Sequence, residues 1–153
     1  MTPFKANTLE VLFTSADFAA LKQRDLSGTV CVVFDILRAT SSMVTALANG
    51  ASAIIPVEEI PEALALRRQQ PGLLLAGERE GVRIQAGLTG SIAFDLGNSP
   101  REFTADRVGG RAIAMTTTNG TRALRACAPA KTVLVSSFLN LRATAEFLSL
   151  IHI

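Results

Sequence analysis

A chain of 153 residues with 48% apolar and 18% charged residues has the composition of one folded domain, which excludes a disordered or fibrous protein. The net charge of +2 is too small to favour nucleic-acid binding, and no apolar run reaches the length of about 18 residues that predicts a membrane span. The N-terminus lacks the basic start and apolar run of a secretion signal, so we expect a mature cytoplasmic protein.

Apolar runs with strand character alternate along the chain with segments of helical periodicity. We expect strands at 9–13, 29–34, 52–57, 73–76, 112–115 and 132–135, and helices at 15–22, 39–48, 61–70, 120–126 and 141–147. Residues 77–100 are rich in glycine, which predicts a long loop that can hold a hairpin, with a short helical turn after Pro100. This alternation is typical of a three-layer α/β/α fold with a mostly parallel sheet.

We interpret residues 1–147 as a single α/β domain that is truncated at its C-terminus. Residues 148–153 interrupt a helix as it begins and resemble a translated sequencing adapter, so we predict a non-native tail. His152, the only histidine, lies in this tail and therefore receives no catalytic role. Cys31 and Cys127 are expected to be buried apolar side chains rather than a disulfide.

Several catalytic chemistries lack the residues that they require. Without a usable histidine, neither a Ser-His-Asp nor a Cys-His nucleophile has a base. No His/Cys cluster predicts zinc, no G-x-x-x-x-G-K-[ST] motif predicts a P-loop, and no G-x-G-x-x-G motif opens the first strand–helix turn. The chemistry must therefore come from carboxylates, arginines, hydroxyls and amides.

The strand at 29–34 runs into Asp35, and Arg38, Thr40 and Ser41 follow at the start of the next helix. A carboxylate at a strand end can hold Mg²⁺ or attack phosphorus, while arginine and hydroxyl groups at a helix start suit an anion. The alternative is that Asp35 only caps the helix and Arg38 is solvated. These residues alone leave both interpretations open.

Polar residues also follow the other strands. They are Glu78 and Arg79 after 73–76, Asp95, Asn98 and Ser99 in the glycine-rich loop, Thr117, Thr118, Asn119, Thr121 and Arg122 after 112–115, and Ser137 and Asn140 after 132–135. Each group alone is also explained by turn or capping chemistry. Together they favour Mg²⁺ and a phosphorylated small molecule, because the carboxyl ends of parallel strands share one edge of the sheet.

Five ordered segments resemble the 2-phosphosulfolactate phosphatase family over about residues 9–147. They are FDILRATSSMVTALANGA (34–51), LLLAGEREG (73–81), FDLGNSPREF (94–103), MTTTNGTRAL (115–124) and SSFLN (136–140). The resemblance implies an α/β fold and a Mg²⁺-dependent phosphatase for a small phosphorylated sulfonate or carboxylate. The family substrate is 2-phospho-3-sulfolactate, which yields 3-sulfolactate and phosphate on the way to coenzyme M.

The resemblance and the strand-end pattern together give a hypothesis for the site. Asp35, Glu78 and Asp95 are the candidate Mg²⁺ ligands, and Asp35, Arg38, Glu78, Arg79 and Asn119 are the candidate catalytic residues. Hydroxyl, amide and guanidinium groups are the candidate substrate contacts: Thr40, Ser41, Asn98, Ser99, Thr117, Thr118, Thr121, Arg122, Ser137 and Asn140. Whether Asp35 binds the metal or attacks phosphorus stays open.

Two other functions stay open. One is a non-catalytic α/β domain that binds a small anion without needing Mg²⁺. The other is a phosphohydrolase of the haloacid-dehalogenase type with Asp35 as nucleophile, although Leu37 stands where that motif requires a second aspartate. A homo-oligomer is compatible with the sequence, and no nucleic-acid or membrane partner is expected.

Overall fold

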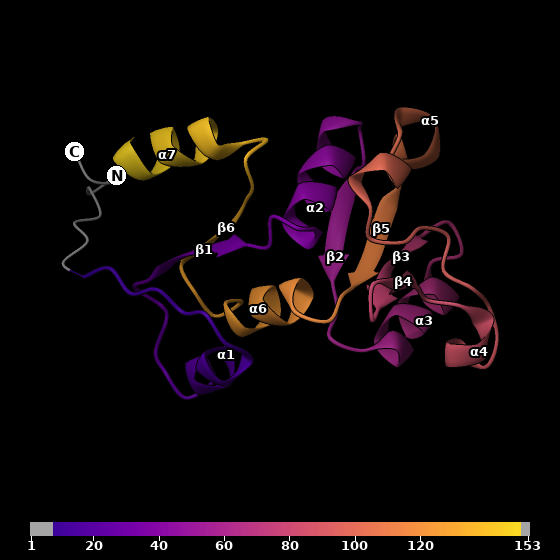
Figure 1. The fold of residues 1–153 in the computed structure, drawn as a ribbon, viewed down its shortest axis with the longest axis horizontal. Helices are drawn as coiled ribbons and strands as arrows, with labels where there is room; N and C mark the ends of the chain where they lie inside the picture. Colours follow the sequence, from indigo (N-terminus) through magenta and orange to yellow (C-terminus); the bar gives the residue numbers. More distant parts are fainter. Residues whose placement is uncertain (1–7, 151–153) are drawn as a thin grey trace.

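A computed structural model describes residues 8–150, in which helices and strands alternate (Figure 1). In chain order the elements are α1 (Ser15–Leu21), β1 (Val30–Phe34), α2 (Ala39–Ala48), β2 (Ala53–Pro56), α3 (Ile60–Gln69), β3 (Leu74–Arg79), β4 (Val82–Arg83), α4 (Ala86–Thr89), the 3₁₀ turn η1 (Pro100–Glu102), α5 (Ala105–Val108), β5 (Ala112–Thr116), α6 (Gly120–Ala126), β6 (Thr132–Ser136) and α7 (Leu141–Leu150). The α/β class predicted from the sequence is confirmed.

The strands form mostly parallel pairs, as expected. One sheet has the order β2-β5-β3-β4, in which only β4 is antiparallel to its neighbour. A second, two-stranded sheet pairs β1 with β6 in parallel. Helices α2 and α6 contact strands of both sheets and connect them. Two segments about 100 residues apart in the sequence therefore lie side by side, with Val30 opposite Thr132 and Phe34 opposite Ser136.

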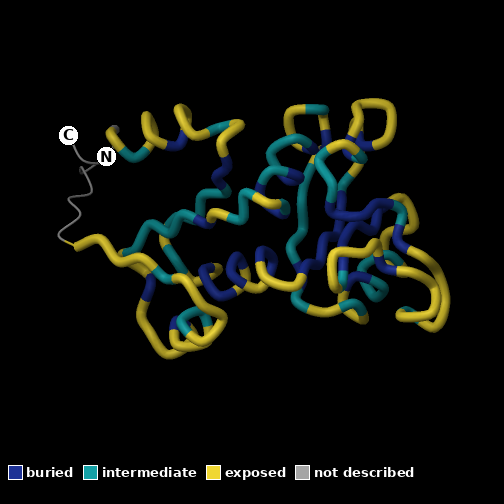
Figure 2. The backbone as a smooth tube through the Cα atoms, viewed as in Figure 1, coloured by how far each residue is buried: buried dark blue, intermediate teal, exposed yellow. Residues whose placement is uncertain are grey.

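Alternate residues of β3 and β5 enter two separate apolar cores. Leu74 and Met115 pack with residues of α2 and α6, whereas Leu75 and Ala114 pack with residues of α3. Figure 2 shows that the buried backbone concentrates in these central strands. The larger sheet thus has helices on both faces, which gives the predicted three layers.

The strand predicted at 9–13 is wrong, because these residues have no regular secondary structure. Leu9, Val11 and Phe13 are largely exposed, and only Leu12 packs against the core. No strand in the described chain pairs with this segment, and an apolar run without a pairing strand cannot form a ladder. The adjacent helix is confirmed, and α1 begins with a capping box in which Thr14 and Asp17 exchange hydrogen bonds.

The glycine-rich segment after β3 begins with a hairpin. Arg79 pairs with Val82, so Glu80 and Gly81 form a two-residue loop. Both loop residues have positive φ, 54° for Glu80 and 80° for Gly81, which is the conformation of the tight turns that suit the twist of antiparallel strands. This turn brings the Gly81 backbone back over the end of β3.

Only the first half of the predicted tail, residues 148–150, belongs to the described part of the chain. Residues 148–150 continue α7, whereas 151–153, with His152, lie outside the described residues. Within residues 8–150 no helix combines the length and apolarity needed to cross a bilayer. Cys31 and Cys127 carry free thiols, and burial, reinforced by the neighbouring Cys31, raises the pKa of Cys127 to about 12.

Candidate functional site at the strand ends

Asp35 is held at the end of β1 by hydrogen bonds within its own loop. Its Oδ1 accepts the Arg38 N–H at 2.8 Å, and its own N–H donates to Thr40 Oγ1 at 3.0 Å. Oδ1 thus stabilises the loop before α2, whose N-cap residue is Arg38 and which receives no side-chain capping hydrogen bond, so the capping role considered from the sequence is not observed. Thr40 is fully buried and supports this loop, so the structure does not turn its hydroxyl toward a ligand.

Glu78 is a buried carboxylate at the end of β3. Its Oε1 accepts the Thr118 N–H and its Oε2 accepts the Gly81 N–H, both at 2.8 Å. Burial raises the pKa of Glu78, but the hydrogen bonds from Thr118 and Gly81 and the nearby Arg38 charge together lower it below its usual value. Glu78 is therefore a fixed negative charge that links two loops.

Further contacts close a ring around the strand ends. The Arg38 guanidinium donates to the Gly81 carbonyl oxygen at 3.4 Å from each terminal nitrogen. Gly120, at the start of α6, packs so tightly that a Cβ there would lie 2.7 Å from Asp35 Oδ2. We call the residues that close this circuit the strand-end ring: Asp35, Arg38, Glu78, Gly81, Thr118 and Gly120. The loops after β1, β3 and β5 thus meet as the predicted topology requires.

A shallow pocket opens beside Asp35 between α1 and α6. Three aromatic side chains and several strand-end residues are part of its lining, which is Phe13, Ser15, Phe18, Val33, Phe34, Asp35, Asn119, Gly120 and Ala123. Asn119 lies exposed at the N-cap of α6, yet its side chain makes no capping hydrogen bond. Phe13 and Phe18 could not be recognised as lining residues from the sequence, because they belong to a segment that carries no polar motif.

Several predicted substrate contacts are instead engaged inside the chain. Thr117 and Thr121 are buried and exchange hydrogen bonds between hydroxyl and backbone N–H groups at 2.9 and 3.1 Å. Ser41 donates to the Ile36 carbonyl oxygen. Asn140 accepts the Ser137 N–H and donates to the Val135 carbonyl oxygen, which fixes the loop after β6.

Asn98 keeps an open acceptor. Its side chain is 6% exposed, and its Oδ1 is buried without a hydrogen-bond partner in the described chain. Its backbone carbonyl oxygen accepts a hydrogen bond from Ser42 Oγ at 2.9 Å. Ser42 lies in α2, one helical turn after Arg38. An unsatisfied buried acceptor costs about 1–3 kcal/mol, so this oxygen favours a donor from outside the described residues. Ser99 follows at the start of η1 without capping it.

Asp95 is not brought to the strand-end ring. Its Oδ2 accepts Arg67 Nη1 at 2.7 Å and the Leu75 N–H at 2.8 Å. Leu75 precedes Glu78 by three strand residues, or about 10 Å. In the described chain no three Asp, Glu, His or Cys side chains gather closely enough to hold a metal ion. The predicted set of three carboxylate ligands is therefore not assembled here.

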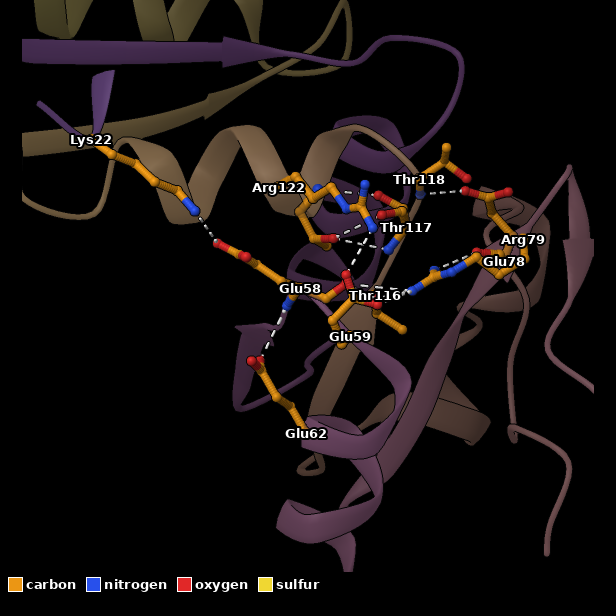
Figure 3. A network of polar contacts seen from close by, with 11 residues as sticks. Lys22, Glu58, Glu59, Glu62, Glu78, Arg79, Thr116, Thr117, Thr118 and Arg122 are labelled. Carbon is orange, nitrogen blue, oxygen red and sulfur yellow. Dashed lines mark hydrogen bonds and ion pairs between the residues drawn. The ribbon is translucent and has the colours of Figure 1, made fainter. Parts of the chain in front are cut away.

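Arg79, at the end of β3, and Arg122, in α6, share a carboxylate that the sequence did not suggest. Arg122 Nη2 is 2.8 Å from Glu59 Oε1, and Arg79 Nη2 is 3.9 Å from Glu59 Oε2 (Figure 3). Since β-strand side chains alternate between faces, Glu78 and Arg79 point to opposite sides. The predicted arginines therefore divide between the ring, with Arg38, and this second cluster.

The fold and the geometry define an α/β protein with a site suited to small anions at the carboxyl edge of its parallel strands. The chain belongs to the 2-phosphosulfolactate phosphatase family, whose model, described as 2-phosphosulpholactate phosphatase, matches residues 17–152.

Curated relatives agree with this assignment. A probable 2-phosphosulfolactate phosphatase of Caldicellulosiruptor saccharolyticus is 42% identical over 137 residues, which are 90% of this chain and 54% of the relative. One of Caldanaerobacter subterraneus subsp. tengcongensis is 43% identical over 140 residues, again 90% of this chain and 55% of the relative. One of Thermotoga petrophila is 45% identical over 117 residues, 76% of this chain and 47% of the relative. The chain spans about half the length of these relatives.

Glu78 should make folding stability depend on pH in the acid range. Because its pKa is lowered on folding, its contribution is complete above the ordinary value of 4.5 and is lost as the pH falls through the folded value. In urea titrations we expect the free energy of unfolding to fall with pH below 4.5. Glu78→Gln should flatten this dependence and cost about 1–3 kcal/mol at neutral pH, since its amide would face a backbone N–H.

Asp25→Asn is the matched control. It removes an exposed carboxylate that accepts one N–H, from Ser27 at 2.9 Å, so it should change the pH slope less than Glu78→Gln does. Equal slopes for the two variants would contradict the role given to Glu78.

Proposed function

We propose that the full-length protein hydrolyses a small anionic phosphate monoester at the strand-end ring, with 2-phospho-3-sulfolactate as the substrate. The observation that carries this proposal is the convergence of Asp35 and Arg38, from the end of β1, with Glu78, from the end of β3, in one circuit of contacts. Membership of the 2-phosphosulfolactate phosphatase family supports the choice of substrate. The products would be 3-sulfolactate and phosphate.

The residues of the ring suit different parts of this reaction. In the described chain the Arg38 guanidinium donates only through long contacts to the Gly81 carbonyl oxygen, so it can turn toward a phosphate group. Glu78 is already satisfied by two backbone donors and holds the loops, which makes it a positioning residue. Asp35 keeps Oδ2 for the reaction, either as a metal ligand or as the nucleophile.

The donor set fits one carboxylate ligand for Mg²⁺. Asp35 Oδ2 accepts no hydrogen bond in the described chain, whereas both Glu78 oxygens accept backbone N–H groups and Asp95 pairs with Arg67. Mg²⁺ commonly takes one or two carboxylates and completes its shell with water and substrate phosphate. When bound, the ion would neutralise phosphate charge and activate water.

Phosphate release tests the proposal. A protein of the relatives' full length that contains this chain should release phosphate from 2-phosphosulfolactate in Mg²⁺ and lose that activity in EDTA. Ethyl phosphate, which lacks a second anionic group, should be a poor substrate. Tight binding of the substrate without phosphate release would overturn the proposal in favour of a non-catalytic anion-binding protein.

Three other expectations stay predictions. They are a place in coenzyme M biosynthesis, a cytoplasmic location and assembly into a homo-oligomer. The first follows only if 2-phosphosulfolactate is the physiological substrate, because related phosphatases with one fold can act on different esters.

A further inference from the structure

Two arginines from different elements converge on one exposed carboxylate. Arg79 ends β3 and Arg122 lies in α6, and both face Glu59 at the start of α3 (Figure 3). Glu59 occupies the N-cap position, yet its side chain makes no capping hydrogen bond to α3. Its carboxylate is instead directed to the guanidinium groups. We call Arg79, Arg122 and Glu59 the arginine pair and its carboxylate.

Arg79 is held in place by neutral acceptors. Its Nη1 donates to the Glu78 carbonyl oxygen at 2.8 Å, and its Nη2 donates to Thr116 Oγ1 at 3.0 Å and to the Glu58 carbonyl oxygen at 3.4 Å. Among the described residues its nearest carboxylate oxygen, on Glu59, is 3.9 Å away. The guanidinium is therefore held in a fixed orientation, and the opposing carboxylate of Glu59 lies beyond hydrogen-bond distance.

Glu59 can leave this position at little cost. Its side chain is 53% exposed, and that of its closer partner Arg122 is 51% exposed. Exposed ion pairs of this kind contribute about 0–1 kcal/mol. Another anion with several oxygens could therefore replace the Glu59 carboxylate, because guanidinium groups bind carboxylate, sulfonate and phosphate oxygens in the same way.

We propose that Arg79 and Arg122 form a subsite for the second anionic group of the ligand, a sulfonate or carboxylate, and that Glu59 occupies this subsite as a tethered competitor. The proposal rests on the proposed function for the identity of the ligand. Arg79 donates to Thr116 Oγ1, and Arg122 lies two residues after Gly120, so the pair is anchored on the same β5–α6 connection that supplies Thr118 and Gly120 to the strand-end ring. Ligand binding would exchange the internal carboxylate for the ligand anion, and an ester without a second anion would leave Glu59 in place.

The test measures binding of inorganic sulfate to the full-length protein by isothermal titration. Glu59→Gln removes the competing charge and keeps the side-chain shape, so sulfate should bind roughly fivefold more tightly. Glu58→Gln is the matched control, because it removes the same charge from the neighbouring residue, whose ion pair is with Lys22 at 3.8 Å. Its effect should be smaller than twofold. Adding Arg122→Gln to Glu59→Gln should abolish the gain.

The outcomes separate this proposal from the proposed function. Equal gains in the two glutamine variants would show a general charge effect and overturn the subsite, as would an unchanged affinity in Glu59→Gln. Sulfate binding requires no turnover. A clear Glu59 effect in a protein that releases no phosphate would therefore sustain the subsite and remove the phosphatase function, and an active phosphatase without the effect would do the reverse.

Discussion

Asp35→Asn should lower the rate of Mg²⁺-dependent phosphate release by about a thousandfold or more in the full-length protein. Asparagine keeps an oxygen that can accept the Arg38 N–H, so the loop after β1 should hold its shape. The substitution replaces the free Oδ2 by an uncharged amide, which can neither hold Mg²⁺ firmly nor attack phosphorus. Steady-state rates with saturating Mg²⁺ and an unfolding curve of the same preparation measure the two effects separately.

Asp95→Asn is the matched control for this experiment. It makes the same chemical change at a carboxylate that pairs with Arg67 and with the backbone of β3. We expect it to lower the free energy of unfolding by about 1–3 kcal/mol while kcat stays within a few fold of the wild type. If Asp35→Asn retained substantial activity, or Asp95→Asn lost as much, Asp35 would not be the centre of the reaction.

Much of the fold follows from local sequence signals. The helix predicted at 39–48 has the bounds of α2, and the run at 29–34 became β1 because its apolar residues can pair with β6. The segment at 9–13 has a similar apolar character but no strand beside it in the described chain. Pairing is a property of the whole fold, so the local pattern could not distinguish these two runs, nor could it predict that β1 and β6 form their own sheet.

The sequence predicts where the candidate site residues meet, but not which residues each of them contacts. Parallel topology brings Asp35, Glu78 and Thr118 to one edge, as the order of the strands predicts. Hydrogen-bond partners depend on side-chain directions that the sequence does not give. Asp95 therefore appeared equivalent to Asp35, although Arg67 neutralises it. Glu59 had no motif around it, and only its position opposite Arg79 and Arg122 indicates a role.

Gly120→Ala should destabilise the fold and the site together. A Cβ at this position would lie 2.5 Å from the Ala39 Cβ and 2.7 Å from Asp35 Oδ2, well inside van der Waals contact. Ala39 is fully buried at the start of α2, so the overlap can be relieved only by moving α6 away from α2. Such overpacking costs about 1–3 kcal/mol, which urea unfolding would measure. Displacement of Asp35 should also reduce phosphate release.

Two further variants test whether the loss of stability in Gly120→Ala comes from its contact with Ala39. Gly87→Ala is the control, because a Cβ there meets nothing within 4 Å in the exposed helix α4, and it should leave stability unchanged or slightly raised. Ala39→Gly removes the methyl group that the new Cβ would strike. Combined with Gly120→Ala, it should show a favourable coupling of about 1 kcal/mol in a double-mutant cycle. Additive losses would mean that α2 and α6 do not meet as closely at Gly120 as the packing around Asp35 requires.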